Sequence, residues 1–119
     1  MRYVNRKNEI TMSRGDNETL TLYTTNKHVC EIWRPSEDDK VYLGIMEANQ
    51  DFENAIVKKA YDSSVVGVLD DTIVIKIKLD SLDTEFLREG TYYYTIKMWL
   101  KDNDLTETLV NRTKLVLIN

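Results

Sequence analysis

The chain has 119 residues, and we expect residues 1–119 to fold as a single domain that buries its core without a metal or a disulfide. Its one cysteine, Cys30, excludes an internal disulfide, and its short apolar runs exclude a membrane-spanning segment. The formal net charge is −4 and the basic residues are dispersed among acids, so we expect neither a nucleic-acid nor a membrane partner.

Alternation of apolar and polar residues with a period of two predicts a chain built mainly of strands. This period places successive side chains on opposite faces of a sheet. Seven segments show the alternation in full or in part, and polar clusters that favour turns separate them. In chain order, the expected strands are Glu9–Ser13, Thr19–Thr24, Lys40–Glu47, Ala55–Lys59, Thr72–Leu79, Thr91–Leu100 and Thr106–Ile118.

The first predicted turn contains Arg14, Gly15 and Asp16, the triplet that many integrins recognise on adhesion proteins. It lies between two alternating segments, where a short corner is expected, and the first ten residues lack an apolar secretion signal. We therefore interpret the triplet as a structural corner. In this corner Gly15 supplies a positive φ, and Asp16 accepts hydrogen bonds from amides that follow it.

Residues suited to catalysis or metal binding are few. His28 and Cys30 could form a base and a nucleophile, but no third group is evident to orient the imidazole. Asp102, Asp104 and Thr106 have the alternate spacing of a calcium loop, but they lack its central glycine and its final acid. We therefore expect no enzymatic activity, no metal site and no cofactor.

The segment Asp80–Gly90 interrupts the alternation. Ser81 or Asp83 can cap a short helical turn near residues 81–88, and Gly90 can end it with a positive φ. We expect the large apolar residues of this turn to face the core, namely Leu82, Phe86 and Leu87.

A helical turn followed by a glycine and a tyrosine-rich strand is typical of the corner between strands E and F of an immunoglobulin-like sandwich. Tyr92 has the place of the corner tyrosine, and Tyr94 has the place of the second cysteine of antibody domains. Both could equally be ordinary core-facing residues. The predicted fold class is all-β, an immunoglobulin-like antiparallel β-sandwich of about seven strands.

The end of the last predicted strand is aliphatic on both faces, from Leu115 to Ile118. A half-exposed strand would not need this, so we expect the strand to be covered. The cover could come from Met1–Val4, from another part of the chain, or from a second subunit in a homo-oligomer. An interaction surface is expected from exposed apolar and aromatic residues, namely Trp33, Tyr93, Trp99 and Leu117.

These motifs together resemble the N-terminal domain of phage and prophage baseplate upper proteins. Such domains open with alternating aliphatic residues and an Arg-Gly-Asp corner, followed by an Asp-x-Val-x-Leu strand and then by Asp-Thr and Leu-x-x-Gly-x-Tyr-x-Tyr. The matching residues here are Ile10, Met12, Arg14, Gly15, Asp16, Asp39, Val41, Leu43, Asp83, Thr84, Leu87, Gly90, Tyr92 and Tyr94.

The resemblance implies an immunoglobulin-like, non-enzymatic module of the virion. Its partners would be other tail or baseplate proteins, and it would assemble in the cytoplasm of the bacterial host. The alternative is a β-sandwich module that binds carbohydrate or a cell-surface ligand, because sugars stack on exposed aromatic rings.

Overall fold

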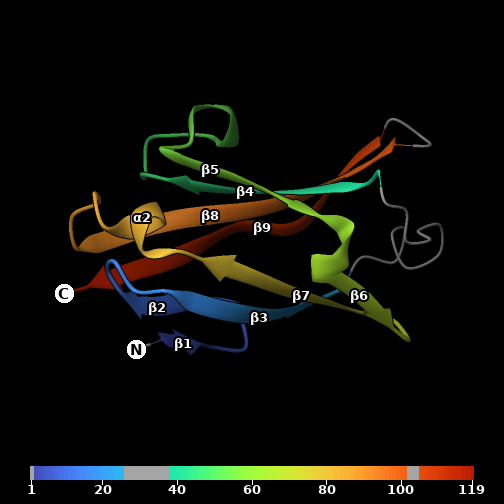
Figure 1. Cartoon of the computed structure of the whole chain (residues 1–119), viewed down its shortest axis with the longest axis horizontal. Helices are drawn as coiled ribbons and strands as arrows, with labels where there is room; N and C mark the ends of the chain where they lie inside the picture. The colour runs from blue at the N-terminus through green and yellow to red at the C-terminus, as the bar shows by residue number, and fades with distance from the viewer. Residues whose placement is uncertain (1, 26–37, 102–104) are drawn as a thin grey trace.

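The computed structural model describes residues 2–25, 38–101 and 105–119 (Figure 1). Most of these residues lie in strands, with one short α-helix and two short 3-10 turns. The elements are β1 (Arg2–Val4), β2 (Ile10–Ser13), β3 (Glu18–Thr24), β4 (Lys40–Met46), η1 (Phe52–Asn54), β5 (Val57–Asp62), η2 (Ser63–Val65), β6 (Val66–Leu69), β7 (Thr72–Leu79), α2 (Ser81–Thr84), β8 (Gly90–Leu100) and β9 (Leu105–Ile118).

The strands form two sheets that pack face to face as a sandwich. The larger sheet has the order β1-β2-β9-β8-β4-β5, and the smaller has the order β3-β7-β6. The order β9-β8-β4-β5 is that of strands G, F, C and C′ of an immunoglobulin-like domain, and β3-β7-β6 is that of strands B, E and D. The predicted all-β sandwich with its short helical turn is confirmed.

All seven expected strands are present, Thr72–Leu79 with the expected bounds and the others with ends displaced by at most three residues. Two further strands, β1 and β6, were not predicted, because β1 has only three residues and β6, Val-Gly-Val-Leu, does not alternate apolar with polar residues. One pairing also departs from the expected antiparallel arrangement, because β2 runs parallel to β9. Such a pairing joins segments from opposite ends of the chain, so local sequence gives no sign of it.

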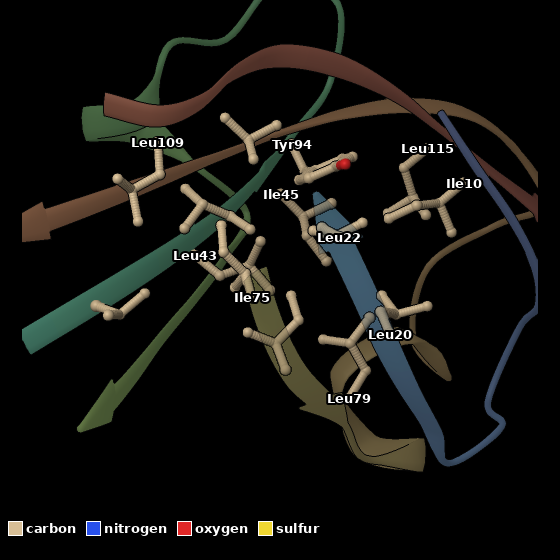
Figure 2. Close-up of a cluster of buried hydrophobic side chains, with 14 of the residues drawn as sticks. Ile10, Leu20, Leu22, Leu43, Ile45, Ile75, Leu79, Tyr94, Leu109 and Leu115 are labelled. Atoms are coloured by element: carbon tan, nitrogen blue, oxygen red, sulfur yellow. The ribbon is translucent and has the colours of Figure 1, made fainter. Parts of the chain in front are cut away.

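The core lies between the two sheets, as Figure 2 shows. Leu20, Leu22 and Ile75 from the small sheet meet Leu43 and Ile45 from the large one. Nine residues at alternating positions of the expected strands are buried, namely Leu20, Leu22, Ile73, Ile75, Ile77, Tyr92, Tyr94, Ile96 and Met98. The period-two pattern therefore assigned these inward faces correctly.

The C-terminal strand β9 lies inside the large sheet, between β2 and β8. Leu115 and Leu117 are each only 1% exposed, so the expected cover comes from within the chain. The segment Arg2–Val4 pairs with β2 and does not touch β9 as a strand neighbour. Leu117 therefore points into the core, and its predicted place on an interaction surface is wrong.

Candidate functional site

The Arg14-Gly15-Asp16 corner is held by contacts within the domain. Gly15 has a φ of 79°, and its amide donates a hydrogen bond of 2.8 Å to Thr84 Oγ1. The Arg14 amide donates to the Ile118 carbonyl at 2.8 Å, and its guanidinium donates to the Leu87 carbonyl at 3.2 Å. The corner thus ties the end of β2 to the end of β9 and to the helical turn.

The Asp16 amide donates to the Ser13 carbonyl at 3.4 Å, which closes the turn itself. Directly after it, Asn17 Oδ1 accepts a hydrogen bond of 2.9 Å from the Ser81 amide at the start of α2. The corner therefore connects two segments that are distant in sequence, through contacts of Arg14, Asp16 and Asn17. This geometry differs from a triplet displayed on an extended loop.

The corner between β7 and β8 contains the tyrosine that the sequence singled out. The Tyr92 hydroxyl donates a hydrogen bond of 2.8 Å to the Arg88 carbonyl, four residues upstream. Gly90, between them, has a φ of 147°, a conformation that side-chain-bearing residues rarely adopt. Tyr92 therefore faces the core and also closes the corner, so both interpretations of this residue are correct.

Tyr94 lies deeper in the core, in the place of the missing cysteine. Its hydroxyl donates a hydrogen bond to the Asn8 carbonyl, which fastens β8 to the turn between β1 and β2. Burial raises the pKa of Tyr94, because the interior penalises the phenolate. A buried tyrosine with one backbone partner thus joins distant segments where antibody domains use a disulfide.

The helical turn exposes two of the three apolar residues that were expected to face inward. Leu82 is 66% exposed and Phe86 is 82% exposed, so the prediction for both is wrong. Leu87 is half-buried, and Thr84 takes the fully buried position. The reason is the Thr84 hydroxyl, which must lie inside to meet the Gly15 amide, and this rotates Leu82 and Phe86 towards solvent.

The solvent side of β4, β5, β8 and β9 gathers aromatic and basic side chains, and we call it the outer sheet face. Strand alternation and register place its members side by side, as in the pair Tyr42 and Lys97 or the pair Lys40 and Trp99. The outer sheet face consists of Lys40, Tyr42, Lys58, Ala60, Asp62, Tyr93, Lys97, Trp99, Arg112 and Lys114.

The predicted interaction residues divide accordingly. Tyr93 and Trp99 lie on the outer sheet face, both half-buried among neighbouring side chains. Trp33 lies outside the described residues, as do His28, Cys30, Asp102 and Asp104. The sequence did not single out Tyr42, Lys97 or Arg112, although their alternation with core residues placed them on the solvent side.

Phe52 from η1 folds over the middle of the outer sheet face, above Gly44. A methyl group added at Gly44 would lie 2.8 Å from the Phe52 ring, so only glycine allows this approach. The Lys97 ammonium lies 4.7 Å from the centre of the same ring, within range of a cation–π contact. Thr95, the strand neighbour of Gly44 on β8, is buried as well.

Arg112 fixes the loop between β4 and η1. Its guanidinium donates to the carbonyls of Gln50 at 2.7 Å, Ala48 at 2.9 Å and Glu47 at 3.1 Å. It also lies 4.6 Å from the centre of the Tyr93 ring. A single cation therefore connects the β4–η1 loop to β8, and it holds the loop that presents Phe52.

A cleft of about 460 Å³ opens beside Phe52. Tyr42, Phe52, Lys58 and Ala60 line it, and Leu43 and Lys59 contribute to its floor. Since Leu43 turns its side chain into the core, its backbone supplies that part of the floor. The volume is within the range of natural ligand pockets, and the walls are mainly apolar.

On the other side of β5, Lys59 joins the strand to the helical turn. Its ammonium lies 2.7 Å from Asp83 Oδ2 and 3.2 Å from Asp80 Oδ2. Partial burial acts to lower the pKa of Lys59, but hydrogen bonds and charge attraction from Asp83 and Asp80 outweigh it and raise the pKa. Burial also raises the pKa of the adjacent Tyr61, whose hydroxyl donates to the Lys78 carbonyl at 2.8 Å. These contacts brace the two sheets against each other.

Within residues 2–25, 38–101 and 105–119, no group of three or more His, Cys, Asp or Glu side chains is arranged to hold a metal ion. No helix in this described part is long and apolar enough to cross a membrane. No family model, curated protein or solved structure matches the chain.

Proposed function

We propose that this protein is a non-enzymatic structural module of a phage or prophage tail, and that it mediates protein–protein assembly at the baseplate of the virion. The observation that carries the proposal is the outer sheet face. Tyr, Trp, Phe and Arg are the residues enriched in the centres of protein interfaces, and here all four types share one side of a sheet.

The resemblance to baseplate upper proteins supports the same role. Its motif residues lie where the fold needs them: Asp39 is buried and accepts a hydrogen bond of 3.1 Å from the Lys101 amide. Thr84 meets Gly15, and Tyr92 closes its corner. The motif thus describes a rigid scaffold, and the outer sheet face is the surface that this scaffold presents.

The test is the composition of assembled particles. Particles purified from the bacterium that carries the gene should contain the protein, detected by mass spectrometry and by immunogold labelling at the tail tip. A variant with Tyr42→Ala and Trp99→Ala should fold but fail to enter particles. The matched control is Tyr23→Ala, an exposed tyrosine on the small sheet, which should enter normally. Absence of the wild-type protein from particles would contradict the proposal.

The second candidate function is recognition of a carbohydrate, and the cleft between Tyr42 and Phe52 favours it. Aromatic walls around an open cleft suit stacking against a sugar ring. Binding to an array of bacterial surface glycans, abolished by Phe52→Ala, would favour this function over assembly.

A further inference from the structure

We propose that the outer edge of β5 and the cleft beside it bind an extended acidic segment of a partner protein. The segment would add a strand next to β5, place one apolar side chain in the cleft, and pair a carboxylate with the ammonium groups of Lys58 and Lys97. This inference rests on the proposed role in protein–protein assembly and names the chemistry of the partner.

The first observation is the position of β5. It is the last strand of the large sheet, and β4 is its only strand neighbour in the described part of the chain. Figure 1 shows β5 along the upper margin of the sandwich, with η1 next to it. An edge strand presents backbone donors and acceptors, which an extended peptide can satisfy by β-augmentation.

The second observation is the cleft itself, which lies over β4 and β5. The small side chain of Ala60 leaves room between the Tyr42 and Phe52 rings, and the walls are mainly apolar. A peptide that runs along β5 would point alternate side chains to this side of the sheet. One of them would enter the cleft as an apolar anchor.

The third observation is charge. The chain carries a net charge of −4, yet the outer sheet face has five cations and a single acid, Asp62. Lys58 lies on the wall of the cleft, and Lys97 reaches the Phe52 ring from β8. On β5, Lys58 lies two positions from Ala60 on one side and Asp62 two positions on the other, so the carboxylate two residues from the anchor on the Lys58 side would face the Lys58 ammonium.

A polyanionic polysaccharide would satisfy the lysines but would leave the backbone groups of β5 without partners. A neutral sugar would use the rings but would gain nothing from the cations. The combination of a sheet edge, an apolar cleft and flanking ammonium groups therefore favours an acidic peptide.

The experiment uses the full chain and a capped peptide of sequence Thr-Glu-Thr-Phe-Thr-Glu-Thr, whose Glu, Phe and Glu side chains share one face of a strand. Titration followed by NMR amide shifts should give a Kd at or below about 1 mM, with the largest shifts in β5 and η1. A peptide with Gln in place of Glu should bind at least about tenfold more weakly, and so should a peptide with Pro on each side of Phe.

Protein variants locate the site. Lys58→Glu combined with Lys97→Glu should weaken binding at least about tenfold. Ala60→Trp should block the cleft independently of charge. Lys76→Glu, an exposed position on the solvent side of β7, is the control and should leave binding unchanged. Circular dichroism melting checks that each variant is folded.

Three results would overturn the inference: no shift at millimolar peptide, equal binding of the Gln peptide, or equal binding of the Pro peptide. Tighter binding of dextran sulfate with the same amide shifts would instead identify a general polyanion site. If the protein enters tails but fails these titrations, the assembly role stands and only the acidic-segment inference is lost.

Discussion

The hydrogen bond between Thr84 and Gly15 offers a sharp test of the corner, because valine replaces threonine with almost no change of shape. Thr84 is fully buried and its Oγ1 accepts from the Gly15 amide at 2.8 Å. Thr84→Val removes the acceptor and keeps the packing, so its main effect is an amide without its partner. A buried unsatisfied group costs about 1–3 kcal/mol. Gly15 is half-exposed, which places the expected loss of unfolding free energy at about 1–2 kcal/mol.

For a chain of this size, each 1 kcal/mol corresponds to about 4 °C in Tm, so Thr84→Val should melt about 4–8 °C lower. Thermal and urea unfolding followed by circular dichroism measure this directly. The control Thr19→Val is exposed on the solvent side of β3 and should change stability by less than about 0.5 kcal/mol. Amide exchange of Gly15 should also accelerate in Thr84→Val. If neither Tm nor that exchange rate changes, the hydrogen bond does not hold the corner.

Gly15→Ala should lower the free energy of unfolding, measured in urea, by about 1–2 kcal/mol. The added Cβ would have room, so this loss would come from the positive φ; a neutral effect would contradict this backbone argument. Gly44→Ala should cost about 1–3 kcal/mol by displacing Phe52, and most of that cost should vanish in a Phe52→Ala background. Additive losses would show that the two residues do not compete for space. Burial raises the pKa of Tyr94 above the ordinary 10.0, so the unfolded state releases its proton first, and stability should be fully present below about pH 10 and fall above it. In Tyr94→Phe, the free energy of unfolding, measured in urea at about pH 8 and pH 11, should decrease less with pH than in the wild type. An equally large decrease would show that Tyr61 and Lys59 cause the loss of stability at high pH.

Local sequence determined much of this protein, because strand periodicity and turn chemistry act over a few residues. The alternation from Ile73 to Leu79 fixed which side chains of β7 share a face, and those at odd-numbered positions are buried. Gly15 and Gly90 marked two corners by the backbone angles that they permit. Tyr92 marked the corner between β7 and β8.

Tertiary structure alone decided what depends on partners distant in sequence. The parallel pairing of β2 with β9 buries Leu117, which the sequence analysis had placed on the surface. In the helical turn after β7, Thr84 lies inside and accepts a hydrogen bond from Gly15, whereas Leu82 and Phe86 point outward. Period two shows which residues share a face, but it does not show which strand lies alongside or which loop lies above. The outer sheet face arises in the same way, because the Phe52 ring can lie on the sheet only where β4 presents Gly44.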